Sequence, residues 1–418
     1  MKTLRFTLIG AAALAFVGLA HAATTDIILT GSTAYRANVY RSIQAVLTST
    51  YGGSGYTVAF SGATNNQAGL EGSQYAIFNS ADGTVRIKTS WTGSESGVQA
   101  VSRNDIFKVA VFPDSQTTGT LGSTSPFGLA APTNTEVAVI DMADTAQAAS
   151  AFNGSYKGKN YPPLTDDTNS PVGIVPFKFI ASPGAAAAGL TNITNQLFRA
   201  LLTNGGTVPL SMFTGNTSDA ATTVYVTGRN PDSGTRVTTY TETGFGIVNV
   251  PTQYQPQNSA NAEIDTAGGT IDHFAPWPRD TVNTIVFPTG QSGYNSGGNL
   301  SKGVNNTPPS GTLLVSYAGT NDCDPQITAG ETELSYNGQK LGGVSGNYNN
   351  NTELTQGQYS FWGYEHLYYN SSASATVISF ADAIGLDLKN NNAVVFRSSM
   401  NVGRSGFVDG GTIIPGGL

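Results

Sequence analysis

The stretch TTVYVTGRNPDSGTRVTTYTE, residues 222–242, holds the pattern on which the predicted fold depends. Thr222–Thr227 is rich in β-branched and aromatic residues, which favour a strand. Gly228-Arg229 ends that strand, and Ser233-Gly234-Thr235 then opens a predicted helix over Arg236–Glu242. The segment therefore reads as a strand, a turn of small polar residues and a helix, with an arginine just before the turn.

The same design occurs twice nearer the N-terminus. Gly31-Ser32-Thr33 separates a predicted strand, Asp26–Thr30, from a helical pattern over Ala34–Leu47. Ser94-Glu95-Ser96-Gly97 follows the alternating segment Val85–Trp91 and leads into another helix start. Strands that alternate with helices are typical of α/β folds with parallel strands.

Two further strands fit this scheme. Val137–Met142 is a predicted strand that ends at Ala143-Asp144, and Pro171–Ala181 is an apolar run without alternation. A strand without alternation is expected where both faces of a sheet are covered.

The three turns have a shared chemistry. The first turn of a helix has unpaired N–H groups at the positive end of the helix dipole, and small residues let an anion approach them. Each such turn, taken alone, is most often only an N-cap. Three of them together with Arg229, whose guanidinium can form paired hydrogen bonds to an oxyanion, favour an anion site.

Composition excludes several functions. Of 418 residues only 11% are charged, where about 25% is average, and the balance of 20 basic against 27 acidic residues gives a net charge of −7. Such a chain lacks the basic surface that nucleic-acid binding requires. The single cysteine, Cys323, excludes a disulfide framework. Long Gly/Asn/Ser/Thr stretches read as surface insertions, namely Ser115–Asn134, Phe152–Ser170, Thr252–Thr270 and Gly338–Gln358.

Residues 1–22 have the pattern of a secretory signal peptide. Lys2 and Arg5 precede the apolar run Thr7–Ala20, and Ala20-His21-Ala22 supplies small residues at a cleavage site. We therefore expect cleavage near Ala22 and a periplasmic or secreted protein.

The heptapeptide Arg229-Asn230-Pro231-Asp232-Ser233-Gly234-Thr235 carries a resemblance to a known family. The sequence resembles the periplasmic phosphate-binding proteins of ABC phosphate importers, in the wider PBP-like, type 2 periplasmic binding protein superfamily, in which Arg is followed after three residues by Ser-Gly-Thr. Further segments look like family landmarks in the same order along the chain: Thr30–Ala34, Gly93–Val101, Val139–Asp144, Ile174–Phe177, Gly311–Tyr317 and Tyr359–Trp362.

The resemblance implies an α/β fold of two lobes, each a mixed or parallel sheet flanked by helices, with a ligand cleft between them. Residues 23–175 and 362–418 would form lobe 1, and residues 176–361 lobe 2. The ligand would be phosphate or a similar oxyanion, passed to an ABC permease of the inner membrane. No catalysis, cofactor, metal or nucleic acid is expected, and the protein would be a monomer.

The resemblance also implies the ligand-binding residues. Lobe 1 would contribute Ser32, Thr33, Ala34, Ser94, Ser96, Gly97 and Asp144, and lobe 2 would contribute Arg229, Ser233, Gly234 and Thr235. Asp144 would accept the proton of a phosphate, which fully ionised sulfate lacks. Asp114 competes for that role, because a long insertion lies before Asp144. Pro231 stands where the family often has an acid, and Asp232 comes one place later.

Other functions remain open at this point. A surface, matrix or polysaccharide-binding protein on the same fold is one alternative, and a phosphoester hydrolase is another. His273 and His366 lack metal-ligand spacing and are expected to be structural. Asp322, Asp324 and Glu331 are interpreted as a solvated acidic loop rather than a calcium site. The aromatic group at 359–369 is interpreted as core rather than a sugar platform.

Overall fold

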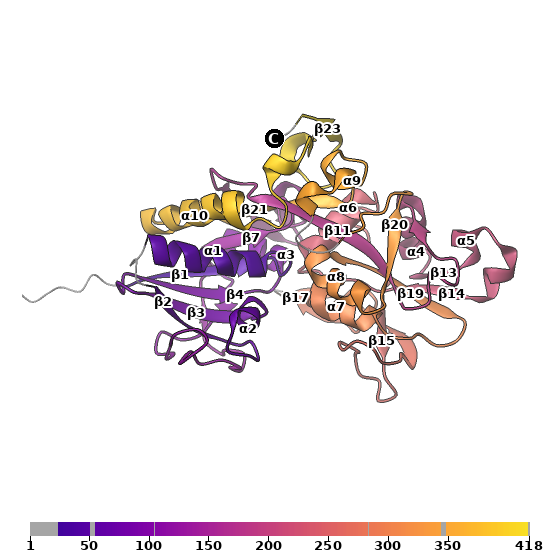
Figure 1. The fold of residues 1–418 in the computed structure, drawn as a ribbon, viewed down its shortest axis with the longest axis horizontal. Helices are drawn as coiled ribbons and strands as arrows, with labels where there is room; N and C mark the ends of the chain where they lie inside the picture. The colour runs from indigo at the N-terminus through magenta and orange to yellow at the C-terminus, as the bar shows by residue number, and fades with distance from the viewer. Residues whose placement is uncertain (1–23, 51–54, 104, 283, 344–347, 417–418) are drawn as a thin grey trace, which may run out of the picture.

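The computed structural model describes residues 24–50, 55–103, 105–282, 284–343 and 348–416. These form two α/β halves side by side, joined by long strands that run between them (Figure 1). The predicted α/β class is confirmed. The signal peptide predicted for residues 1–22 lies outside the described residues. Within the described part of the chain, no helix has the length and apolar character needed to cross a membrane.

The N-terminal half is built on a mixed sheet. Strand β1 (Thr25–Gly31) pairs in parallel with both β4 (Val85–Ser90) and β7 (Ile140–Ala143). Strand β3 (Tyr75–Ser80) runs antiparallel to β4, and β2 (Tyr56–Phe60) runs antiparallel to β3. Since β4, β1 and β7 are parallel neighbours, the turns that follow them emerge at one edge of the sheet.

The other half has a second strand group. Strand β14 (Thr223–Val226) lies parallel to β19 (Thr312–Gly319) and antiparallel to β13 (Thr207–Pro209). Strand β11 (Gly173–Ala181) pairs antiparallel with β19 and with β20 (Thr332–Tyr336). The predicted strands at 222–227 and 171–181 are therefore confirmed with small shifts of their ends.

Two strands connect the halves into a single sheet. Strand β11 pairs antiparallel with β21 (Trp362–Tyr369), from Gly173 opposite Glu365 to Pro176 opposite Trp362. On its other edge β21 pairs with β7, so the strand order runs from β13 in one half to β2 in the other without a break. All nine residues of β11 are buried, as its unalternating apolar sequence predicts.

Helices flank this sheet (Figure 1). They are α1 (Arg36–Ser49), α2 (Gln67–Glu71), α3 (Ser94–Ser102), α4 (Asn195–Thr203), α5 (Ser211–Thr214), α6 (Gly234–Glu242), α7 (Gly297–Val304), α8 (Thr320–Thr328), α9 (Thr352–Thr355) and α10 (Ala375–Asp387). Helix α10 lies along α1, so that this late segment of the chain returns to the N-terminal half, whereas β23 at the end of the described chain lies near α9 (Figure 1).

The insertions are more ordered than their composition indicates. Residues 152–170 contain the hairpin of β8 (Gly154–Tyr156) and β9 (Lys159–Tyr161), and residues 252–270 contain β15 (Tyr254–Gln257), paired with β16 (His273–Pro276). The remaining strands are β5 (Val109–Ala110), β6 (Thr135–Glu136), β10 (Thr165–Asp166), β12 (Asn192–Ile193), β17 (Asp280–Val282), β18 (Ile285–Phe287), β22 (Val402–Arg404) and β23 (Ile413–Pro415).

Aromatic side chains form the core beneath the connecting strands. The Phe179 ring stacks on Phe361 with centroids 4.7 Å apart, and its centroid lies 4.9 Å from that of Phe198. Members of the aromatic group at 359–369 are buried, Trp362 and Tyr364 completely. The interpretation of this group as core is confirmed.

Candidate functional site

The predicted polar turns meet where the two halves face each other. The N–H of Gly93 donates to the Gly31 carbonyl at 2.9 Å, which joins the turns after β4 and β1. The N–H of Glu95 donates to the Asp232 carbonyl of the other half, also at 2.9 Å. Gly93 permits this approach because its φ is +114° and a Cβ there would lie 2.3 Å from that carbonyl oxygen.

Asp144 lies at the centre of this meeting point. It follows β7 and is only 2% exposed. Ser94 Oγ donates a short hydrogen bond to Asp144 Oδ1, and Thr235 Oγ1 donates to Oδ2 at 2.8 Å. Thr238 Oγ1 donates to the Asp144 backbone carbonyl at 3.0 Å. Thus Asp144 ties the N-terminal half to the start of α6, while a carboxylate with about four lone-pair sites keeps acceptor capacity beyond these bonds.

Gly234 is the position of closest approach. A Cβ at Gly234 would lie 2.1 Å from Asp144 Oδ1 and 2.7 Å from Ser94 Oγ. These separations are far below van der Waals contact, so only glycine fits here in the arrangement of the two halves that the structure has.

Arg229 is a buried cation beside these turns. It is 1% exposed, and its Nε and Nη2 donate to the backbone carbonyls of Tyr294 and Asn295, each at 3.1 Å. Its Nη1 makes no hydrogen bond to any residue in the described ranges. Burial lowers the pKa of Arg229, opposed by the nearby carboxylates of Asp322 and Asp144, but an arginine stays charged in proteins. Two backbone carbonyls therefore hold the guanidinium in place, and its Nη1 is left without a partner among the described residues.

The first predicted loop contributes fewer free backbone N–H donors than expected. The N–H of Ser32 is taken by the Met142 carbonyl at 2.6 Å, so it is not a free donor. The Ser32 hydroxyl, by contrast, is buried and has no partner among the described residues. The N–H groups of Thr33 and Ala34 make no bond within the described part of the chain, and α1 begins two residues later.

Three other predicted ligand-binding residues have mainly structural roles. Ser96 Oγ accepts a hydrogen bond from Thr92 at 3.1 Å. Gly97 makes room for Asp141, since a Cβ there would lie 1.8 Å from Asp141 Oδ1. Ser233 caps α6 by accepting from the N–H of Arg236 at 3.2 Å. Their contacts support the turns rather than face an open site.

Asp114, the rival of Asp144, lies elsewhere. Its carboxylate pairs with Lys88 at 2.5 Å and with Arg86 at 2.8 Å, and its side chain is 60% exposed. Asp144 is the acid that contacts the donor turns.

The acidic segment around Cys323 is a correction to the sequence interpretation. Its first part forms α8, in which Asp324 is buried in an ion pair with Lys178 at 2.9 Å, and Glu331, three residues beyond the helix, is buried against Ser301. It is therefore packed rather than solvated. No group of three or more His, Cys, Asp or Glu residues within the described ranges could hold a metal ion.

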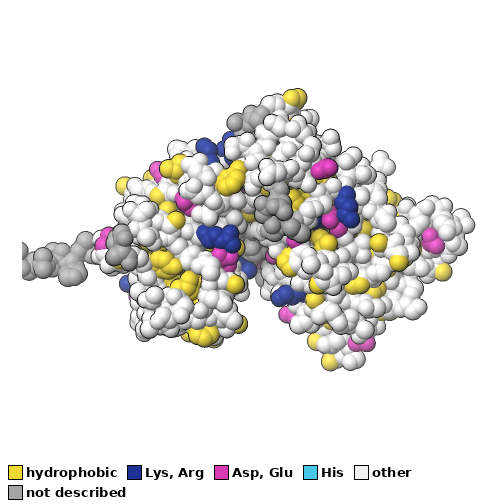
Figure 2. Space-filling view, in the orientation of Figure 1, with side chains coloured by type: hydrophobic (Ala, Val, Ile, Leu, Met, Phe, Trp, Pro, Cys, Tyr) yellow, Lys and Arg dark blue, Asp and Glu magenta, His cyan; other side chains and the backbone are white. Residues whose placement is uncertain are grey.

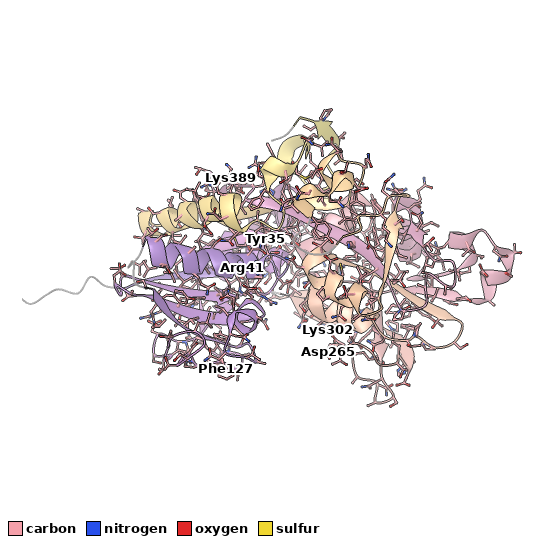
Figure 3. All side chains as sticks on the ribbon, viewed as in Figure 1. Tyr35, Arg41, Phe127, Asp265, Lys302 and Lys389 are labelled. Carbon is pink, nitrogen blue, oxygen red and sulfur yellow. The ribbon has the colours of Figure 1, made fainter. Side chains whose placement is uncertain are left out.

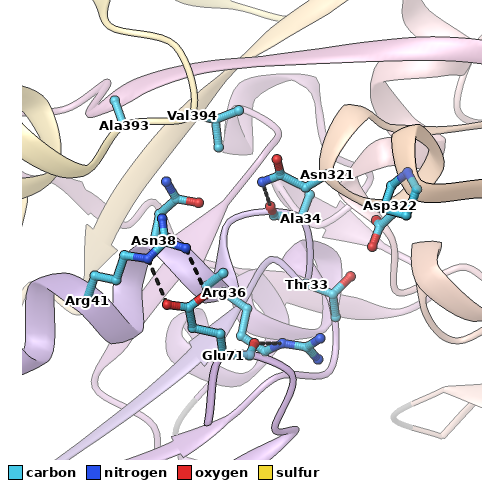
Figure 4. A pocket seen from close by; sticks show the side chains of 12 residues that line it. Thr33, Ala34, Arg36, Asn38, Arg41, Glu71, Asn321, Asp322, Ala393 and Val394 are labelled. Atoms are coloured by element: carbon cyan, nitrogen blue, oxygen red, sulfur yellow. Dashed lines mark hydrogen bonds and ion pairs between the residues drawn. The ribbon is translucent and has the colours of Figure 1, made fainter. Parts of the chain in front are cut away.

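Asp322 is a site residue that sequence reasoning missed. Its Oδ2 lies against the start of α7, 2.0 Å from where a Gly297 Cβ would be. Burial raises the pKa of Asp322 to about 6, and the charges of Arg229, Arg36 and Lys302 act against that rise. Figure 4 shows Asp322 and Asn321 of α8 opposite Thr33 and Arg36 of the N-terminal half. An acid among three cations thus borders the cleft.

The cleft itself is open to solvent beside the turns. One cavity of about 480 Å³ lies between Arg36 and Trp91 on one side and Asn230 and Lys302 on the other. The surface view shows this hollow between the halves, with basic side chains on both of its sides (Figure 2). Arg41 and Lys302 mark the two opposing halves in Figure 3.

Glu95, inside the second turn, has a strongly perturbed ionisation. It is 1% exposed, and burial raises its pKa to about 8, although Ser150 Oγ donates to Oε2 at 2.7 Å and favours the charged form. Between about pH 4.5 and about pH 8, the folded protein therefore keeps a proton on Glu95 that the unfolded chain has released. Rising pH from about 4.5 to about 8 lowers the free energy of unfolding.

We expect the free energy of unfolding of Glu95→Gln to fall less steeply with rising pH than that of the parent, because the amide has no proton to lose. Thermal unfolding followed by circular dichroism at pH 5 and pH 8 measures it. Glu353→Gln, a partly exposed position, is the control and should retain the parental slope. A Glu95→Gln slope equal to the parent's would contradict the assignment.

The two histidines contact neighbouring side chains in the fold. His366 is 2% exposed, stacks on Tyr368, and lies 3.3 Å from Asp166 through its Nδ1. His273 Nε2 contacts Gln257 Oε1 at 3.0 Å. Neither contact joins a histidine to a serine hydroxyl, so no triad is seen among the residues described.

No protein-family model matches the sequence, and no curated protein matches it. Among solved structures, a phosphate ABC transporter substrate-binding protein with bound phosphate from Clostridium perfringens is similar at 13% identity and a TM-score of 0.42, covering 88% of this chain and 98% of that one. An ABC-type phosphate transport receptor from Vibrio cholerae is similar at 12% identity and a TM-score of 0.40, covering 87% and 96%. PstS from Borrelia burgdorferi is similar at 14% identity and a TM-score of 0.35, covering 88% and 97%.

Proposed function

We propose that this protein is a substrate-binding protein that captures an oxyanion, inorganic phosphate or a phosphate group, in the cleft between its halves. The observation that carries the proposal is the group around Asp144: a buried carboxylate bonded to Ser94 and Thr235 at the start of two helices, next to the buried Arg229. Helix starts and a guanidinium attract an anion, and the carboxylate selects one that still has a proton.

The remaining parts of the proposal rest on the sequence resemblance and on the signal-peptide pattern of residues 1–22. The ligand would be handed to an ABC permease, from a protein that is exported after cleavage near Ala22 and acts as a monomer. Lobe 1 would comprise residues 23–175 and 362–418, and lobe 2 residues 176–361. These boundaries fall within β11 and just before β21, the two strands that connect the halves. We propose binding without catalysis.

Isothermal titration of the chain from residue 23 onward tests the proposal. Phosphate and arsenate, which keep a proton near neutral pH, should release heat with a one-to-one stoichiometry, and sulfate should bind far more weakly. Absence of heat with all three anions would reject the proposed function.

Asp144→Asn should reverse the selectivity. The amide removes the negative charge that repels a fully ionised anion and also removes one acceptor for a ligand proton. We expect phosphate affinity to fall by about tenfold or more, the effect of about one charge-assisted hydrogen bond, and sulfate affinity to rise. Titration with both anions measures the ratio.

Asp272→Asn, at an exposed position, is the matched control and should leave both affinities unchanged. Unchanged selectivity in Asp144→Asn would remove Asp144 from the binding site.

A further inference from the structure

The start of α8 forms part of the wall of a second cavity, of about 390 Å³, where the two halves meet. Asn321 donates from its Nδ2 to the Ala34 carbonyl at 3.4 Å, so this helix start lies directly against the first predicted loop (Figure 4). Arg41 and Glu71, further along the cavity wall, form an ion pair with each other at 2.7 Å. Asp322 follows Asn321 and lines the same cavity, so it lies beside a loop that the proposed function assigns to the anion.

A second element places Asp322 close to Arg229. Asp322 Oδ2 lies 2.0 Å from where a Gly297 Cβ would be, at the start of α7. Two residues before Gly297, the Asn295 carbonyl accepts a hydrogen bond from Arg229 Nη2 at 3.1 Å. Among the charged groups that act on the ionisation of Asp322, Arg229 has the largest effect. The carboxylate therefore lies near both the first predicted loop and the guanidinium.

The carboxylate of Asp322 has charged neighbours but no bonded partner. Asp322 is half-buried, and its carboxylate forms no hydrogen bond or ion pair with any residue in the described ranges. The charges that act on it belong to Arg229, to Arg36 of α1, to Lys302 of α7 and to Asp144. Burial raises the pKa of Asp322 to about 6, so the group is mostly neutral at pH 5 and mostly ionised at pH 8. An anion at Arg229 therefore meets a nearby negative charge at pH 8 that is largely absent at pH 5.

A bound anion would in turn change the ionisation of Asp322. A like charge nearby disfavours the charged form of a carboxyl group and raises its pKa. Between pH 6 or so, where free Asp322 titrates, and that raised pKa, binding of the anion would take up one proton from the solvent. By linkage, the contribution of Asp322 to anion affinity then increases as the pH falls through this interval.

We propose that Asp322 makes anion capture proton-linked: its ionised carboxylate repels the anion and lowers the affinity, and uptake of a proton by Asp322 removes the repulsion. This inference rests on the proposed function, because it concerns the same anion at Arg229. The role differs from that of Asp144, which would accept the proton of the ligand, whereas Asp322 takes its proton from the solvent.

Isothermal titration of the parent and of Asp322→Asn with phosphate at pH 5 and pH 8, at constant ionic strength, tests the inference. The variant should bind phosphate about tenfold more tightly than the parent at pH 8, as expected for removal of one like charge near the ligand in a partly buried site. At pH 5 the two affinities should be equal. The ratio of affinities at each pH is the measured quantity, because the titration of phosphate, Asp144 and Glu95 is common to both proteins and cancels.

Asp272→Asn, at an exposed position, is the matched control and should bind as the parent does at both pH values. A ratio for Asp322→Asn that is the same at pH 5 and pH 8, or no gain at pH 8, would overturn the inference and leave the proposed function intact. Absence of phosphate binding by the parent and the variant at both pH values would reject the proposed function and the inference with it. If Asp322→Asn does not fold, Asp322→Ser removes the same charge and should give the same two ratios.

Discussion

Arg229→Met should abolish oxyanion binding. The side chain is almost fully buried, and two of its nitrogens are held by the carbonyls of Tyr294 and Asn295, so it is positioned before any ligand arrives. A hydrogen bond to a charged group contributes about 1.5–3 kcal/mol, and the Coulomb attraction adds to it in a buried site. We expect phosphate affinity to fall by at least about 100-fold, measured by isothermal titration at constant ionic strength.

Two further variants separate charge from fold. Arg229→Lys should give an intermediate loss, because an ammonium keeps the charge but lacks the planar fork. Arg279→Met, at an exposed arginine, should bind as the parent does. Thermal unfolding of each variant must stay near the parental value. Phosphate affinity within about twofold of the parent in a folded Arg229→Met would exclude this arginine as the anion ligand.

Gly234→Ala should keep the two halves apart. The added methyl would lie 2.1 Å from Asp144 Oδ1 and 2.7 Å from Ser94 Oγ, so the start of α6 cannot stay against the turn after β4. Adding a methyl group to a packed contact costs about 1–3 kcal/mol, which corresponds to a loss of about 5- to 150-fold in affinity. Titration measures the affinity, and small-angle X-ray scattering measures the radius of gyration with ligand present.

The matched control is Gly298→Ala, at another helix start, where the nearest atom to the new Cβ is 3.5 Å away. It should keep both the affinity and the compactness of the parent. If Gly234→Ala binds phosphate with parental affinity and the same radius of gyration, the contact between Asp144 and α6 is not required for the bound state.

The local sequence patterns predicted where the turns lie, but not which distant strands and side chains they contact. The strand ends at Gly31, Ser90 and Val226 and the helix starts that follow them could be read from periodicity and small polar residues, because both signals are local. The direction of β21 and β3, which makes the sheet mixed, depends on pairing between distant segments. The sequence also left open whether Asp144 or Asp114 lies near the donor turns. Asp114 instead forms ion pairs with Arg86 and Lys88, and these contacts can be seen only in the folded structure.

Asp322 illustrates the limit most clearly. In the sequence it stands in an acidic run without ligand spacing, which is typical of an exposed loop. In the fold, α8 packs against α7 and brings the carboxylate to Gly297 and near Arg229. Gly97 shows the reverse: its sequence context resembles a donor loop, yet the space it leaves is filled by Asp141.

The shared sheet sets how the two halves can move. Because β11 and β21 are hydrogen-bonded to each other from Gly173 to Pro176, separating Asp144 from Thr235 cannot rely on two independent flexible tethers. Any movement of one half against the other has to twist β11 and β21 together, and the residues of both strands are buried. We expect such a pair of strands to allow a small twist and to resist a wide swing, because a wide swing would break the hydrogen bonds between them. Release of a captured ligand would then be governed by the stiffness of these two strands as well as by the contacts in the cleft.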